Sequence, residues 1–223
     1  MIYVFARWLL ASLFRLGWRP EISGTEHIPR TGPLLVASNH LSFIDSFVIP
    51  LAVAERRVTF LAKSEYFTGT GLRGRLQRLV FTALGAVPVP RDESVEARAA
   101  LQTALEVLDR GWACGIYPEG TRSRDGRLYR GRTGIAWLAL TSGAPVLPVG
   151  LVGTDRVQPV GSHRLRIARV AVRIGPVVRP QDYAGQGSAA AQRRRLTDDL
   201  MDRIAALSGQ ERAGTYNERT PEG

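Results

Sequence analysis

The chain has 223 residues, of which 44% are hydrophobic and 22% are charged, a balance that fits one globular α/β domain. Its formal charge of +10 favours an anionic partner, such as a phosphate ligand, an acidic lipid headgroup or nucleic acid. A single cysteine excludes an internal disulfide, and with only three histidines there is no recognisable zinc spacing, so no metal site is expected.

Residues 1–18 are dense in large apolar side chains but are interrupted by Arg7 and Arg15. The segment is shorter than the roughly 20 apolar residues that a membrane-spanning helix needs, and it has no basic leader or cleavage site of a secretory signal. Its apolar and basic residues lie on different sides of a helix, which predicts an amphipathic helix in a membrane interface. A helix that packs on its own domain has the same pattern, so both interpretations remain open.

The rest of the chain alternates strands and helices in the manner of an α/β domain over residues 19–207. We predict a single domain with a mixed, largely parallel central sheet that is flanked by helices. The pattern predicts strands at 33–38, 57–62, 85–91, 112–117, 145–152 and 165–174, and helices at 47–54, 76–84, 94–110, 134–140 and 188–207. The polar residues 208–223 are predicted to be a disordered tail.

The first turn whose residues are suited to catalysis is the segment 39–45, in which His40 follows a buried strand and Asp45 begins the next helix. Residues five apart in a helix point about 140° away from each other. If His40 instead lies in the turn before a helix that Ser42 caps, Asp45 can fold back and accept a hydrogen bond from one ring nitrogen. The other nitrogen is then free to take a proton from a hydroxyl. A His and an Asp that merely decorate a helix start would have the same spacing.

The hydroxyl that loses its proton is expected to belong to a substrate, because the chain has no serine in a Gly-x-Ser-x-Gly elbow. A second turn, 118–123, follows the strand 112–117 and contains Glu119, Gly120, Thr121 and Arg122. Glycine allows close approach of a ligand, threonine offers a hydroxyl, and arginine offers a planar fork for phosphate. A plain β-turn with a surface ion pair is the alternative. Lys63, the only lysine, ends the strand 57–62, where open α/β sheets bind ligands.

Four segments in this order resemble the motif blocks of glycerolipid acyltransferases, most closely the bacterial 1-acylglycerol-3-phosphate acyltransferases. They are His40-x4-Asp45, residues 85–91, Tyr-Pro-Glu-Gly-Thr-Arg-Ser at 117–123, and Ala-Pro-Val-Leu-Pro-Val at 144–149. The resemblance implies transfer of a fatty acyl group from acyl-CoA or acyl carrier protein to the free hydroxyl of 1-acylglycerol 3-phosphate, which gives phosphatidic acid. No cofactor is implied beyond the acyl donor.

The resemblance also implies roles for individual residues. His40 is expected to be the general base and Asp45 the residue that orients it. The residues expected to hold the phosphate and glycerol of the acceptor are Lys63, Arg91, Glu119, Gly120, Thr121 and Arg122. Lys63 matches one basic position of the family's pattern, whereas Ser64 stands where a second lysine is usual.

The expected partners are a lysophospholipid acceptor, an acyl thioester donor and an anionic membrane surface, with the protein peripheral on the cytoplasmic face of the cell membrane. Glycerol 3-phosphate, another lysophospholipid or a lyso-ornithine lipid are alternative acceptors. A non-catalytic binder of anionic lipid or nucleic acid is an alternative of another class. No nucleic-acid partner is expected, because the arginines are dispersed and no nucleic-acid-binding motif occurs.

Overall fold

The structure is a computed structural model of the 223-residue chain. It describes residues 12, 16–53, 56, 58–63, 68–71, 74–75, 78–79, 82, 86–89, 93–162, 164–185 and 187–218. Most of the predicted interface helix 1–18 and of the predicted helix 76–84 lies outside the described residues. No helix in the described part of the chain is both long enough and apolar enough to cross a bilayer.

One mixed sheet forms the centre of the molecule, with the order β1-β7-β6-β2-β5-β3-β4 among the described residues. The strands are β1 (Glu21–Ser23), β2 (Leu34–Ser38), β3 (Val58–Lys63), β4 (Val87–Val89), β5 (Ala113–Ile116), β6 (Val146–Val152) and β7 (Ala171–Ile174). All neighbouring strands pair in parallel except β6 and β7, which are antiparallel. This confirms the predicted mixed, largely parallel sheet.

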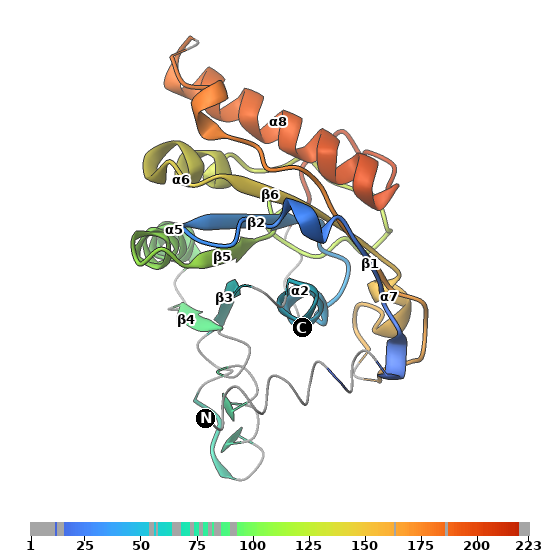
Figure 1. The fold of residues 1–223 in the computed structure, drawn as a ribbon. Helices are drawn as coiled ribbons and strands as arrows, with labels where there is room; N and C mark the ends of the chain where they lie inside the picture. Colours follow the sequence, from blue (N-terminus) through green and yellow to red (C-terminus); the bar gives the residue numbers. More distant parts are fainter. Residues whose placement is uncertain are drawn as a thin grey trace.

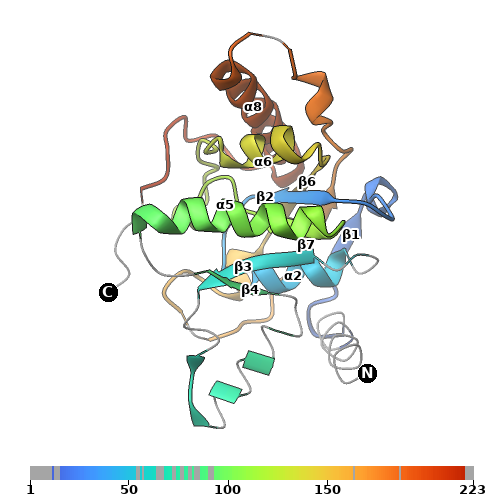
Figure 2. The ribbon, with the colours of Figure 1, turned by 90° about the vertical axis from the view of Figure 1, so that its left-hand side faces the viewer.

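Helices cover both faces of this sheet (Figure 1). They are α2 (Asp45–Ala52), α5 (Glu93–Asp109), α6 (Gly134–Ser142), α7 (Thr154–Val157) and α8 (Ala189–Ser208), with short 3-10 turns at Thr25–His27 and Pro180–Asp182. In Figure 1, α6 and α8 lie above the central strands and α2 lies below them. Helix α5 packs on β3, β4 and β5 and lies in front of the sheet in Figure 2.

The central strand β2 is buried on both faces, as expected for a strand between two helical layers. Its side chains alternate between the layers: Leu34 and Val36 join the core on the side of α2, and Leu35 and Ala37 join the core beneath α5, α6 and α8. Burial of both faces leaves only the strand ends accessible. The loops that follow β2 and β5 are therefore the parts of these strands where polar side chains can meet a ligand.

Two predictions for the C-terminal half of the chain are wrong. The last strand, β7, begins at Ala171 rather than at residue 165, and Leu165 and Ile167 are 57% and 88% exposed. Residues 208–218 of the predicted disordered tail are ordered in the structure. Backbone N–H groups of Leu128 and Arg130 donate to Glu211 and Thr215, both at 2.8 Å, and Ala213 donates back to Leu128 at 2.9 Å. These main-chain bonds hold residues 211–215 along the loop after β5, which a polar composition does not reveal.

Candidate active site

The loop after β2 is fixed by Asn39, which is fully buried. Its side-chain oxygen accepts a hydrogen bond from the backbone N–H of Leu151 at 2.8 Å, and its amide donates to the Leu151 carbonyl at 2.9 Å. The same amide donates to Gln210 Oε1 at 2.7 Å. Asn39 therefore joins the end of β2 to the end of β6 and to the C-terminal segment, and it sets where His40 leaves the sheet.

Asp45 folds back onto His40, as the sequence predicts. Its Oδ2 lies 2.9 Å from His40 Nδ1, and it also accepts hydrogen bonds from the backbone N–H groups of Leu41 at 2.7 Å and Ser42 at 2.8 Å. Because Oδ2 is an acceptor for the ring, Nδ1 carries the proton and the lone pair is on Nε2. The Asp45 side chain is completely buried, whereas 16% of the His40 side chain is exposed. The ring can therefore be reached by a substrate, but the carboxylate cannot.

Helix α2 begins differently from the prediction. Ile44, not Ser42, occupies the N-cap position, and no side chain caps the helix there. The Ser42 hydroxyl instead donates to the carbonyl of Gln158 at 2.8 Å, which ties this turn to the segment after α7. The carboxylate of Asp45 accepts the backbone N–H groups of Leu41 and Ser42, which precede the helix, and at the same time it holds the His40 ring. One side chain thus shapes the turn and orients the His40 ring.

Tyr117, directly after β5, supports the imidazole from its other side. The two rings stack with centroids 3.7 Å apart and planes within 7°. The Tyr117 hydroxyl shares a hydrogen bond of 2.9 Å with Ser46. Burial, followed by the negative charge of Asp45, raises the pKa of Tyr117 well above its ordinary value of 10.0, while the Ser46 bond opposes this shift. Tyr117 therefore stays neutral and serves as a platform for His40.

Glu119 connects the two predicted turns. It is fully buried, and its Oε1 and Oε2 accept hydrogen bonds from the backbone N–H groups of His40 at 3.0 Å and Tyr129 at 2.9 Å. Burial raises the pKa of Glu119 from 4.5 to about 7, although these two hydrogen bonds act to lower it. Both oxygens accept from the protein backbone, so Glu119 helps to fix the position of His40. Its expected contact with the acceptor stays a prediction.

The structure describes some of the remaining predicted site residues and leaves others out. Gly120 has a φ of +82°, and a Cβ at this position would lie 3.0 Å from Nε of Arg132, so the turn requires glycine. Thr121 and Arg122 follow it, both partly exposed, and the Arg122 carbonyl accepts a hydrogen bond from the Asn217 side chain at 3.1 Å. Lys63 is the last residue of β3, but its side chain and all of Arg91 lie outside the described residues.

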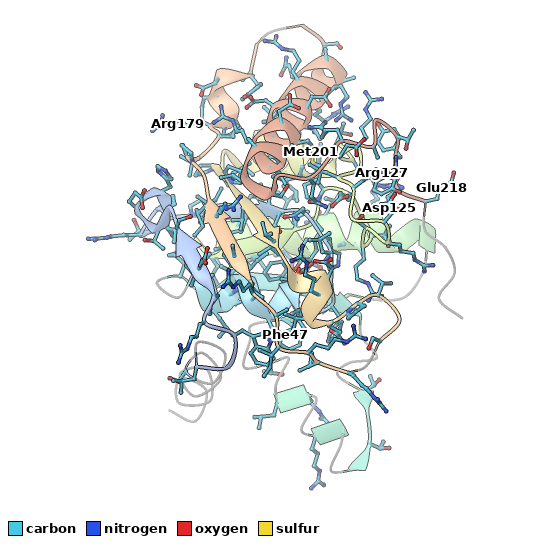
Figure 3. All side chains as sticks on the ribbon, turned by 90° about the vertical axis from the view of Figure 1, so that its right-hand side faces the viewer. Phe47, Asp125, Arg127, Arg179, Met201 and Glu218 are labelled. Carbon is cyan, nitrogen blue, oxygen red and sulfur yellow. The ribbon has the colours of Figure 1, made fainter. Side chains whose placement is uncertain are left out.

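The loop beyond this turn is stabilised by an ion pair between Asp125 and Arg127, with 2.7 Å between Oδ2 and Nε (Figure 3). Desolvation acts to raise the pKa of Asp125, but hydrogen bonds from Arg127, Tyr129 and Ser123 outweigh it, so the pKa lies below its ordinary value of 3.8. Within the described residues, no three His, Cys, Asp or Glu side chains are grouped so that they could hold a metal ion. The hydrogen bonds that Asp125 accepts from Ser123, Arg127 and Tyr129 hold the loop.

Sequence reasoning did not assign a role to Asn39 or Gln210. Gln210 accepts from Asn39 and donates through Nε2 to the carbonyl of Gly126 at 2.7 Å, so it bridges the two loops of the site. Glu218, further along the same segment, lies on the same side of the molecule as Asp125 and Arg127 in Figure 3. Asn39 stands beside His40 in the sequence, which was a signal for its importance, whereas Gln210 has no local signal because it lies 171 residues from Asn39.

The fold and the site define an α/β protein with a candidate general base, His40, at the end of a central strand. Residues 19–152 match the model of the family described as Acyltransferase. Because this match covers more than half of the chain, the protein belongs to the Acyltransferase family.

Comparison with individual proteins agrees with this assignment. A chloroplastic 1-acyl-sn-glycerol-3-phosphate acyltransferase of Brassica napus is 29% identical over 162 residues, which are 72% of this chain and 45% of that protein. A 1-acyl-sn-glycerol-3-phosphate acyltransferase of Borreliella burgdorferi is 31% identical over 144 residues, which are 65% of this chain and 55% of that protein. The chain thus spans about half the length of these relatives.

A solved structure has the same fold. The 1-acyl-sn-glycerophosphate (LPA) acyltransferase PlsC from Thermotoga maritima superposes with a TM-score of 0.69, over 92% of this chain and 80% of that chain. The sequence identity is 24%, so the likeness is one of fold.

Proposed function

We propose that this protein transfers an acyl group from an acyl thioester to the free hydroxyl of 1-acylglycerol 3-phosphate, which yields phosphatidic acid. The observation that carries the proposal is the hydrogen bond between Asp45 and His40 Nδ1, which leaves Nε2 of a partly exposed ring as a base. Membership of the Acyltransferase family and relatives named for this reaction support it.

In the proposed mechanism, His40 Nε2 removes the proton of the acceptor hydroxyl while the hydroxyl oxygen attacks the carbonyl carbon of the thioester. The carbonyl π electrons move onto oxygen, which gives a tetrahedral intermediate. When the intermediate collapses, the carbon–sulfur bond breaks and the thiolate takes the proton from the His40 imidazolium. Because the carboxylate of Asp45 faces Nδ1–H, it stabilises the positive charge that His40 carries between these steps.

The neighbours of His40 supply the geometry that this mechanism needs. The stacked Tyr117 ring, the Asp45 carboxylate and the hydrogen bond from the His40 backbone N–H to Glu119 restrict the imidazole from three sides. A base that is held in place contributes through orientation as well as through proton transfer. We assign contact with the acceptor to Arg122, since it follows Gly120 in the turn that faces the end of β2, and to Lys63 and Arg91 by resemblance.

We further propose that the protein works as a peripheral membrane protein on the cytoplasmic face, where its lipid acceptor resides. Leu16, Leu165 and Ile167 are 75%, 57% and 88% exposed. The side chains of Trp18 and the 167–169 segment line one hollow, and Trp18 donates a hydrogen bond to the carbonyl of Arg166 at 2.9 Å. Exposed apolar side chains among arginines are suited to an interface with anionic lipid.

The experiment that tests the proposed reaction offers the purified full chain a labelled acyl donor and a panel of acceptors. The panel contains 1-acylglycerol 3-phosphate, glycerol 3-phosphate, lysophosphatidylcholine and a lyso-ornithine lipid, each tried with acyl-CoA and with acyl carrier protein. We expect labelled phosphatidic acid, with the phosphorylated lysolipid preferred. Labelled product from another acceptor alone would assign a different substrate, and no product with any acceptor would refute the proposal.

A further inference from the structure

The C-terminal segment contacts both turns of the candidate active site. Helix α8 ends at Gly209, which has a φ of +72°, and the chain then continues beside the loop after β5. Residues 210–217, which we call the C-terminal strap, pair with this loop in parallel, with Arg212 opposite Leu128. Three main-chain hydrogen bonds with Leu128 and Arg130 hold the middle of the strap. The side chains at its two ends are therefore available for other contacts.

The first end of the strap reaches the turn that carries the base. Gln210 Oε1 accepts a hydrogen bond from the Asn39 side chain at 2.7 Å, and Gln210 Nε2 donates to the carbonyl of Gly126 at 2.7 Å. Because both halves of the amide are used, the orientation of Gln210 is fixed. Asn39 is fully buried and directly precedes His40. A displacement of Gln210 is therefore passed to the backbone of His40 through one side chain.

The second end of the strap reaches the turn after β5. The Asn217 side chain donates to the carbonyl of Arg122 at 3.1 Å, and the Asn217 carbonyl accepts from Nη2 of Arg132 at 3.3 Å. Arg132 in turn is joined to the turn, because its backbone N–H donates to the Pro118 carbonyl at 2.8 Å and its side chain lies against Gly120. Asn217 thus holds the turn both directly and through Arg132.

Tyr216 anchors this second end. Its ring lies 5.3 Å from the guanidinium carbon of Arg130 and 5.8 Å from that of Arg132, distances at which a cation is attracted to an aromatic face. Its hydroxyl accepts a hydrogen bond from Nη1 of Arg194, on helix α8, at 3.2 Å. The same nitrogen donates to the carbonyl of Gly131 at 2.9 Å. The end of the strap is therefore fixed to the helix and to the loop at once.

We propose that the strap holds the turn with His40 and the turn with Arg122 in a fixed relation, and that Gln210 and Asn217 are the positioning residues. The proposal rests on the proposed function, which gives the two turns separate tasks. Gln210 acts through Asn39 on the base, so its loss should slow proton transfer. Asn217 acts through the backbone of Arg122, so its loss should weaken binding of the acceptor. The two ends of the strap therefore affect different kinetic constants.

The kinetic test compares Gln210→Met and Asn217→Leu, which keep the approximate size of each side chain and remove its hydrogen bonds. Thr215→Ala is the control, because Thr215 is exposed and its side chain forms no hydrogen bond with the described residues. We expect Gln210→Met to lower kcat roughly ten- to a hundredfold with little change in KM for 1-acylglycerol 3-phosphate. Asn217→Leu should raise that KM roughly fivefold with little change in kcat. The control should match the wild type.

Direct contacts between the two turns remain in these variants. The backbone N–H of Ser123 still donates to the His40 carbonyl at 2.7 Å, so each variant should fold, and circular dichroism checks this. If Gln210→Met does not fold, Gln210→Asn replaces it, because an amide that is one methylene shorter is too short to reach both Asn39 and Gly126. Wild-type kinetics in either folded variant would overturn the proposal. So would the same change of kcat and KM in both, because the strap would then only stabilise the fold.

A spectroscopic measurement tests the strap independently of turnover. The chain has three histidines, so the imidazole signals of His40 in ¹H–¹⁵N NMR spectra are identified as those that His40→Ala lacks. We expect Gln210→Met to shift these signals and Asn217→Leu and Thr215→Ala to leave them in place. If this shift occurs but the wild type transfers no acyl group, the proposed function fails and the link between the strap and His40 stands. Unchanged His40 signals in Gln210→Met would refute that link whatever the turnover.

Discussion

The substitution Glu119→Gln should stabilise this protein relative to the wild type at high pH and should lower its activity. Glu119 is fully buried, and its pKa is raised from 4.5 to about 7, chiefly by desolvation. Ionisation of Glu119 is therefore unfavourable for the folded state, yet an ionised carboxylate is the form in which both oxygens can accept the N–H groups of His40 and Tyr129. Glutamine imitates the neutral acid and cannot ionise.

The magnitude follows from linkage between protonation and folding. Between pH 4.5 and 7 the folded protein holds the Glu119 proton while the unfolded chain has released it, so the free energy of unfolding falls as pH rises. A pKa that rises from 4.5 to about 7 corresponds to about 3 kcal/mol. This contribution is fully present below pH 4.5 and is lost as pH rises through 7. The free energy of unfolding of Glu119→Gln, measured relative to that of the wild type, should therefore increase by about 3 kcal/mol between pH 4 and pH 8.

The activity should change in the opposite direction. Glutamine has one acceptor oxygen, so either the His40 or the Tyr129 backbone N–H must face an amide NH₂ group. The backbone that carries the base then shifts. A displacement of this kind should lower kcat roughly ten- to a hundredfold above pH 7.

Urea denaturation of both proteins at intervals between pH 4 and pH 8 measures the first effect, and turnover at pH 8 measures the second. Glu106→Gln, which removes an exposed carboxylate from α5, controls for the loss of a negative charge. A difference in unfolding free energy between Glu119→Gln and the wild type that stays constant with pH would refute the reasoning. So would full turnover in the folded variant, because the carboxylate would then be unnecessary for positioning His40.

Three other predictions follow from the site and the surface. His40→Ala and Asp45→Asn should each lower kcat roughly 10²- to 10⁴-fold while leaving the fold intact by circular dichroism, and near-normal turnover in either would exclude the general-base mechanism. Gly120→Ala should lower the free energy of unfolding by about 1–2 kcal/mol in urea, because its φ of +82° is strained for alanine; an unchanged midpoint would contradict this. Replacing Leu165 and Ile167 together by serine should weaken flotation with anionic vesicles roughly tenfold, and equal flotation would show that these side chains do not enter the bilayer.

The contact between His40 and Asp45 could be predicted from the sequence because the two residues are close together along the chain. His40 and Asp45 are five residues apart, so the possible arrangements of one turn include the observed contact. Strand β2 was predictable because both of its faces are apolar. Glu119 could be located in the right turn, but its burial and its use of both oxygens depend on backbone groups 79 and 10 residues away. The residue types do not indicate which backbone N–H groups will lie near the carboxylate of Glu119.

The C-terminal segment shows where composition misleads. Residues 209–218 are polar, but Leu128, against which they run, is completely buried. The segment is held by main-chain hydrogen bonds to Leu128 and Arg130 and by Gln210, and such bonds can be formed by almost any residue type. Because Gln210 also bonds Asn39, the order of this segment and the position of His40 are coupled through a single buried amide. The polar end of the chain therefore belongs to the architecture of the site, although it contributes no group to the proposed chemistry.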